Sequence, residues 1–202
     1  MKKLVMRISV FLLACSFLLG TKIFATPAFA SNEEAFYRAL QINSNQYIFN
    51  FWGGTRESRP IDPYDPNVRP IIIDGRTMVP MRAMGNLVRT GDGMEAFDVG
   101  WYGSENLAVL YDVSGGRRAI AAFRIGNNTA VYYDESGNPR QVTIPVAPVI
   151  IGGRTYLPLR AVANAFDHVE IEWVPETRGI VIFTSWSRPS NIMFPDGSTH
   201  RF

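Results

Sequence analysis

The chain has 202 residues, 47% of them hydrophobic, and a net charge of only +2. It is therefore long enough to bury a core, and it lacks the clustered positive charge that a nucleic-acid partner requires. The single cysteine, Cys15, excludes a disulfide within the chain and a metal site built from several cysteines.

Residues 1–30 are predicted to be a secretory signal peptide. Lys2, Lys3 and Arg7 precede an apolar stretch at residues 8–20, and Ala28-Phe29-Ala30 is a small-x-small cleavage site. Cleavage there would remove four cations and no acid, so the remaining chain would be slightly acidic and without lysine. We therefore expect a secreted or cell-surface protein that has no lysine for Schiff-base chemistry.

Two alternatives to cleavage involve the membrane. The apolar character continues to Ala30, so the leader could be retained as an anchor. Leu12-Leu13-Ala14-Cys15 resembles a lipobox, in which the cysteine is lipidated and becomes the first residue. In both alternatives the leader alone would contact the membrane.

Residues 31–67 are expected to form an N-terminal segment and a proline-rich loop. Residues 33–40 are compatible with a short helix, and the aromatic alternation of residues 46–51 predicts a strand. The loop that follows is punctuated by Pro60, Pro63, Pro66 and Pro70. We interpret it as an ordered connection, and the alternative is a polyproline II ligand for a partner.

An internal repeat dominates the rest of the sequence. PIIIDGRTMVPMRAM at residues 70–84 returns as PVIIGGRTYLPLRAV at residues 148–162. A repeat of this length predicts a repeated structural unit rather than one catalytic pocket. The positions to which we assign a structural role in this motif and just after it are Gly75, Arg76, Thr77, Pro80, Arg82 and Trp101 in the first copy, and Gly153, Arg154, Thr155, Pro158, Arg160 and Trp173 in the second.

Each copy predicts a hairpin followed by a helix. The apolar triplets at residues 71–73 and 149–151 are expected to be buried strands, and the glycines after them to form hairpin turns. Pro80 and Pro158 suit the first turn of a helix. The helical spacing of one face continues through Leu159, Val162, Ala163 and Phe166.

Trp101 and Trp173 occupy equivalent places after these helices, and an apolar strand follows each of them. Their matched placement predicts packing in the core, and the alternative is a sugar-binding platform. Further strands are expected at residues 118–124, 129–133 and 141–144, and a loosely held tail at residues 187–202.

These elements predict an α+β fold. Short antiparallel strands would form one or two twisted sheets packed with two repeat-related helices, giving an internal pseudo-two-fold repeat. Because the middle strands separate the two copies, residues 68–186 are expected to form one domain of interleaved repeats.

The doubled motif, with a helix, a tryptophan and a strand after each copy, resembles the copper amine oxidase N-terminal-like domain of exported Gram-positive bacterial proteins. The resemblance covers about residues 68–184, and residues 90–97 depart from it as an insertion. In amine oxidases this domain is a stalk remote from the copper, so the resemblance implies a non-catalytic module without a cofactor. The two histidines of the chain are too few for a three-histidine copper site.

The arginines are the main candidates for a site. A cation in the first turn of a helix opposes the helix dipole, so we expect Arg82 and Arg160 to pair with a carboxylate such as Asp98 or Glu172. The alternative is a pair of anion-binding arginines. Arg76 and Arg154 are expected to be exposed or stacked on neighbours.

Metal and catalytic sites have weaker support. Asp62, Asp65 and Asn67 offer oxygen ligands for Ca²⁺, but their spacing matches no calcium loop. His168 and His200 belong to no recognisable catalytic arrangement. We therefore predict no catalytic, cofactor-binding or metal residue.

The function predicted from the sequence is that of an exported, non-catalytic structural or interaction module at the cell surface. Its partner would be a cell-wall polymer or another surface protein. The alternative is a domain that binds cell-wall polysaccharide or peptidoglycan through aromatic side chains and arginines.

Overall fold

The structure, a computed structural model, describes residues 36–50, 55–88, 97–113, 116–184 and 188–202. The leader, with its cleavage and lipidation sites, and residues 89–96 lie outside the described residues, as does Phe51 at the end of the predicted strand 46–51. Within the described part of the chain, no helix is long and apolar enough to cross a membrane.

The predicted α+β class is wrong, because the protein is mostly β. Strands hold 51% of the described residues and helical turns 12%, with two α-helices among them. These are α1 (Met84–Leu87) and α2 (Leu159–Ala163), each little more than one turn. Segments this short lack the length that stabilises a helix by itself, and they are too small to cover the sheets.

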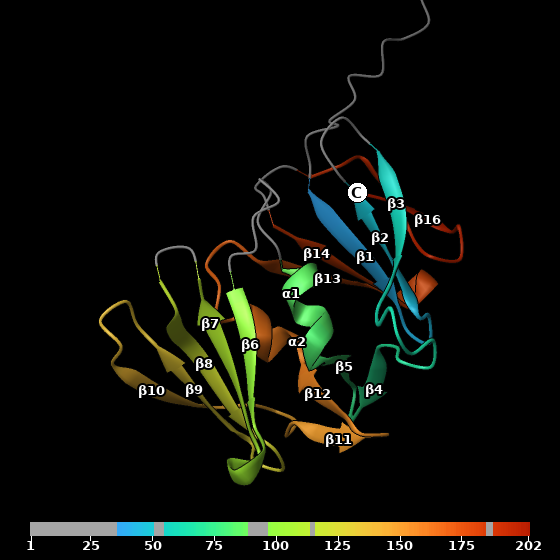
Figure 1. Cartoon of the computed structure of the whole chain (residues 1–202). Coiled ribbons are helices and arrows are strands. Elements are labelled where there is room, and N and C mark those ends of the chain that lie inside the picture. The colour runs from blue at the N-terminus through green and yellow to red at the C-terminus, as the bar shows by residue number, and fades with distance from the viewer. Residues whose placement is uncertain (1–35, 51–54, 89–96, 114–115, 185–187) are drawn as a thin grey trace, which may run out of the picture. The chain divides into compact units, whose positions relative to one another are not determined.

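Two five-stranded antiparallel sheets have matching strand orders (Figure 1). Sheet A has the order β13-β14-β1-β2-β3, and its strands are β13 (Glu170–Val174), β14 (Gly179–Phe183), β1 (Tyr37–Gln41), β2 (Gln46–Asn50) and β3 (Arg56–Pro60). Sheet C has the order β6-β7-β8-β9-β10, and its strands are β6 (Phe97–Tyr102), β7 (Leu107–Asp112), β8 (Arg118–Arg124), β9 (Thr129–Tyr133) and β10 (Pro139–Thr143).

Each of these sheets combines strands from both copies of the repeat. In sheet A, β13 and β14 follow the second motif, and β14 pairs with β1, the first of three strands that precede the first motif. In sheet C, β6 and β7 follow the first motif, and β7 pairs with β8, the first of three strands that precede the second. Each copy of the repeat therefore completes its sheet with strands from the other copy. In Figure 1 the blue strand β1 lies beside the orange β14.

Two backbone hydrogen bonds, one beside sheet A and one beside sheet C, occupy equivalent positions in the two copies. Ile42 N–H donates to the carbonyl of Arg178 at 3.1 Å, and Ile125 N–H donates to that of Asn106 at 2.9 Å. Both acceptors have a left-handed backbone, with φ of 51° at Asn106 and 52° at Arg178. The repeated unit therefore extends to β1–β3, upstream of the doubled motif.

Sheet B joins the two motifs in the order β11-β12-β5-β4. Its strands are β4 (Ile71–Ile73), β5 (Arg76–Pro80), β11 (Val149–Ile151) and β12 (Arg154–Pro158). The strands β4 and β11 form as predicted, but the expectation that they are buried is wrong. Ile72, Ile150 and Ile151 are exposed, because both strands lie at the edges of this sheet.

One main core contains residues from sheets A, B and C and from both helices. The phenol of Tyr132 on β9 donates a hydrogen bond of 2.8 Å to the carbonyl of Ala161, which ties α2 to sheet C. The predicted helical face of the second copy ends early, since α2 stops at Ala163. Phe166 packs instead against Phe97, with their ring centroids 4.9 Å apart.

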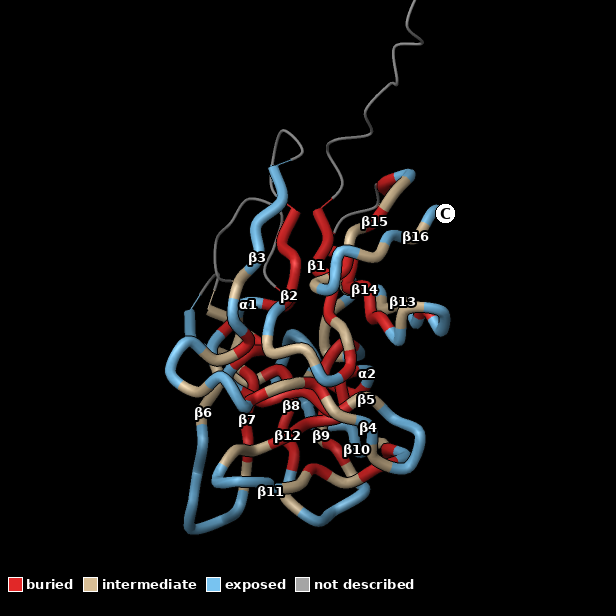
Figure 2. The backbone as a smooth tube through the Cα atoms, turned by 90° about the vertical axis from the view of Figure 1, so that its right-hand side faces the viewer, coloured by how far each residue is buried: buried red, intermediate tan, exposed pale blue. Residues whose placement is uncertain are grey.

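Two predictions for the chain ends are wrong. Residues 37–41 form β1 rather than a helix, and Figure 2 shows β1 and β2 buried while β3 is exposed. The tail is not loosely held, because β15 (Asn191–Met193) and β16 (Thr199–Arg201) form a hairpin. Phe194, in the turn of this hairpin, is fully buried with Tyr37 and Phe183 of sheet A.

Candidate functional site

A large cleft of about 470 Å³ lies where the first motif meets the second. Its lining comes from the hairpin of β4 and β5, from β12, α2, β13 and β14, and from residues 142–145 at the end of β10. Its lining includes the polar and large apolar side chains that a ligand could contact, namely those of Arg76, Thr77, Arg160, Asn164, Trp173 and Ile72. The charged residues among the described lining are the two arginines, and no carboxylate belongs to it.

The turn before β5 places Arg76 at the mouth of this cleft. Asp74 and Gly75 have φ of 49° and 71°, the left-handed backbone that a tight hairpin turn requires. Ile73 pairs with Arg76 across that turn. Arg76 is exposed, and its described hydrogen bond is a long one of 3.5 Å to the carbonyl of Gly75.

Arg160 and Trp173 reach the cleft from the second copy. Pro158 ends β12 with an extended backbone and Leu159 is buried, so the next residue, Arg160, faces solvent. Trp173 on β13 is 39% exposed, and its counterpart Trp101 on β6 is 40% exposed. The prediction that these tryptophans pack in the core is therefore wrong, because both line clefts.

The expected ion pairs of Arg82 and Arg160 are also absent. Among the described residues neither arginine pairs with a carboxylate, and the carboxylate of Asp98 lies 3.2 Å from a guanidinium nitrogen of Arg117 instead. Both arginines are exposed, so water solvates their charge without a partner.

A second, smaller cleft of about 120 Å³ is the counterpart of the first with the roles of the copies exchanged. It joins the turn of the second motif to the start of the first helical segment, η2 (Met81–Ala83). Each of its residues occupies the position of a residue in the large cleft: Ile61, Asp62, Pro80, Met81, Arg82, Ala83, Trp101, Gly153, Arg154 and Thr155. The repeat therefore builds the same site twice.

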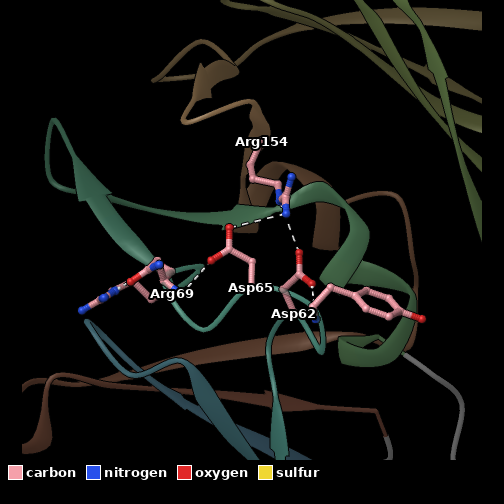
Figure 3. Close-up of polar contacts among 6 residues, drawn as sticks. Asp62, Asp65, Arg69 and Arg154 are labelled. Atoms are coloured by element: carbon pink, nitrogen blue, oxygen red, sulfur yellow. Dashed lines mark hydrogen bonds and ion pairs between the residues drawn. The ribbon is translucent and has the colours of Figure 1, made fainter.

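The small cleft is lined by Asp62 of the proline-rich loop, and Asp65 of the same loop also contacts its arginine. Nε of Arg154 lies 3.3 Å from Oδ2 of Asp62, and its Nη2 lies 3.5 Å from Oδ2 of Asp65. Figure 3 shows Arg154 reaching down between the two aspartates. Asp62 is largely buried, with 11% of its side chain exposed. Both aspartates therefore form ion pairs with Arg154, which does not match the calcium site considered from the sequence.

The large cleft has no such loop. Residues 62–69 separate Ile61 from Pro70, whereas only residues 145–147 separate their counterparts Ile144 and Pro148. The position of Asp62 is taken by Pro145. Arg76, the counterpart of Arg154, therefore has no ion-pair partner among the described residues.

Several lining residues were missed in the sequence. Asn164 lines the large cleft. It follows Arg160 at the same spacing at which Asn86 follows Arg82, so the sequence motif extends to this asparagine. Ile144 also lines the large cleft, and its counterpart in the first copy is Ile61. Upstream of these two residues, RIGNN at residues 124–128 resembles QINSN at residues 41–45. That second, weaker similarity would have revealed the full length of the repeat.

The arrangement suits binding rather than acid–base chemistry. Guanidinium groups stay protonated at physiological pH, so they attract anions and cannot exchange protons with a substrate. Threonine and asparagine side chains can donate further hydrogen bonds, and the half-exposed indole offers an apolar face. In the described residues, no group of three or more histidine, cysteine, aspartate or glutamate side chains is placed to hold a metal ion.

Comparison with known proteins gives one match. A family model for the copper amine oxidase N-terminal domain matches residues 61–183. This range contains both motifs and both clefts, and it begins after β3. No curated protein and no solved structure matches the chain.

Proposed function

The chain belongs to the copper amine oxidase N-terminal domain family, a non-catalytic accessory domain, and on that premise we propose that it is an exported interaction module of the cell surface. It holds a protein partner in the large cleft and performs no reaction there. The observation that carries the proposal is the cleft itself, which Arg76 and Arg160 both line while no carboxylate belongs to its described lining.

Export is supported by the leader of the sequence, with its basic start, apolar stretch and small-x-small site at residues 28–30. An anion-binding cleft that remains open after folding is available to another molecule. Arginine suits such recognition because its planar group can donate two parallel hydrogen bonds to one carboxylate.

Binding to cell walls tests this proposal. The purified protein is incubated with Gram-positive cell walls, either untreated or stripped of their proteins by protease. We expect saturable binding to the untreated walls that is lost after protease treatment. Arg160→Met should weaken it, whereas Arg82→Met, at the equivalent position of the small cleft, should not. Absence of binding to either preparation would overturn the proposal.

A second candidate function is binding of cell-wall polysaccharide. It is favoured by the exposure of Trp173, because an indole face in an open cleft can stack on a sugar ring. Binding that survives protease treatment and is lost in Trp173→Ala, but kept in Trp101→Ala, would support this function in place of the first.

A further inference from the structure

We propose that the large cleft binds an acidic, proline-containing peptide segment of its partner, whose carboxylates engage Arg76 as Asp62 and Asp65 engage Arg154, while Arg160 adds a second positive charge to the cleft. This inference rests on the proposed function and names the chemistry of the ligand. The argument comes from the small cleft, where a loop of this chain narrows the same site and supplies carboxylates to its arginine.

The small cleft shows what the repeated site accepts. The internal counterpart of a ligand is the segment Asp62-Pro63-Tyr64-Asp65-Pro66, in which Asp62 lines the cleft and both aspartates pair with Arg154. Tyr64 is 91% exposed and does not line the cleft. The recognised features are therefore two carboxylates three positions apart, within a segment stiffened by proline.

The large cleft has the same receptor groups and more room. Arg76 occupies the position of Arg154, and Arg160 occupies that of Arg82. The chain segment that would fill it is reduced to residues 145–147 and carries no acid. A peptide from another molecule can take the place that the loop occupies in the small cleft.

The apolar part of the cleft favours a peptide over a simple anion. Trp173, Ile72 and Ile171 line it together with the arginines. Proline rings pack well on exposed indole faces, and an extended proline-containing segment loses little conformational entropy on binding. Charge and apolar contact in one cleft therefore match an acidic segment that also contains proline.

A peptide with the sequence of residues 61–67, Ile-Asp-Pro-Tyr-Asp-Pro-Asn, is the probe. Its binding to the purified full chain is measured by calorimetry at low salt. We expect saturable binding to one site, weakened about tenfold or more in Arg76→Met, as for the loss of a charged hydrogen bond, and to a smaller extent in Arg160→Met, which removes the second positive charge of the cleft. Arg82→Met is the matched control and should bind as the unchanged protein does. Circular dichroism of each variant establishes that it is folded.

Three results would overturn the inference. The first is equal binding of a control peptide in which asparagine replaces both aspartates. The second is tighter binding of a uronic-acid oligosaccharide than of the peptide, which would assign the cleft to an anionic sugar. The third is no peptide binding. If protease-sensitive binding to cell walls through Arg160 were then retained, the proposed function would stand and only the ligand class would be wrong.

Discussion

Val79 and Leu157 face each other at the centre of the pairing between β5 and β12, and both side chains are fully buried. On one side of this pair Met78 faces Pro158, and on the other Pro80 faces Tyr156. Met78 and Tyr156 occupy equivalent positions of the two copies, as do Pro80 and Pro158, so the pairing is symmetric between the copies. The pairing therefore fixes how the two motifs meet, and with it the geometry of both clefts.

Replacing Leu157 by alanine should destabilise the protein strongly. The change removes buried methyl groups beside Val79, so we expect the free energy of unfolding to fall by about 2–5 kcal/mol in urea titrations. The double variant with Val79→Ala should depart from the sum of the single variants by about 0.5 kcal/mol or more, because the side chains are neighbours. Ile150→Ala, at an exposed position, is the control. Strict additivity would show that the central pair does not interact.

The ion pairs of the small cleft should contribute modestly and in a salt-dependent way. Arg154→Met removes contacts to Asp62 and Asp65 that are only partly buried, so we expect a loss of about 1 kcal/mol at low salt. The loss should shrink in high salt as the charges are screened. Arg76→Met is the matched control and should change the stability little at either salt concentration. Equal effects of both variants would contradict the asymmetry between the clefts.

Local patterns in the sequence predicted the strands of sheet C well. Residues 118–124 and 129–133 form β8 and β9 as expected. The helix expected at residues 33–40 failed because β1 lies between β14 and β2 in the middle of sheet A. Its residues 37–40 are all buried, so no alternation marks them as a strand.

The candidate site was predictable only in part. The doubled motif singled out the arginines and tryptophans that line the clefts, but it could not show that each cleft combines residues from both copies. A tryptophan that recurs at equivalent positions of two copies gives the same sequence pattern whether its side chain lies in a core or lines a cleft. The pairing of Arg154 with Asp65 joins residues far apart in the chain, and no local pattern encodes it.

Tyr132 should make the stability depend on alkaline pH. Burial raises the pKa of its phenol above the ordinary value of 10.0, an effect only partly offset by Arg140 and Asn164. Its contribution is therefore complete below pH about 10 and is lost as the pH rises through the raised pKa of the folded state. Tyr132→Phe should flatten this part of the curve of unfolding free energy against pH.

The same variant tests the hydrogen bond to α2. Loss of the phenol leaves the carbonyl of Ala161 without its donor, which should cost about 1–2 kcal/mol at neutral pH. The equivalent position in sheet A is Phe49, so the ring alone fits such a site. Tyr133→Phe, at a less buried position, is the control. An unchanged stability of Tyr132→Phe, with an unchanged pH profile, would show that the bond contributes nothing.

The C-terminal hairpin should be integral to the fold. Phe194 is fully buried against sheet A, so Phe194→Ala should lower the free energy of unfolding by about 3–5 kcal/mol. Gly179→Ala tests the same contact from the other side, because an added Cβ would lie 2.2 Å from the ring of Phe194. It should destabilise the unchanged protein, and it should add less destabilisation in the Phe194→Ala background, where the ring is gone and Oγ1 of Thr177, 2.6 Å from the added Cβ, remains the close neighbour.

The control is Phe202→Ala, since that ring is 47% exposed and its removal should cost much less. Thermal unfolding followed by circular dichroism measures all four variants. Because this hairpin covers sheet A and lines neither cleft, the single substitutions should leave peptide and cell-wall binding unchanged at temperatures where the variants are folded. A small effect of Phe194→Ala, equal to that of Phe202→Ala, would mean that the hairpin is only loosely attached.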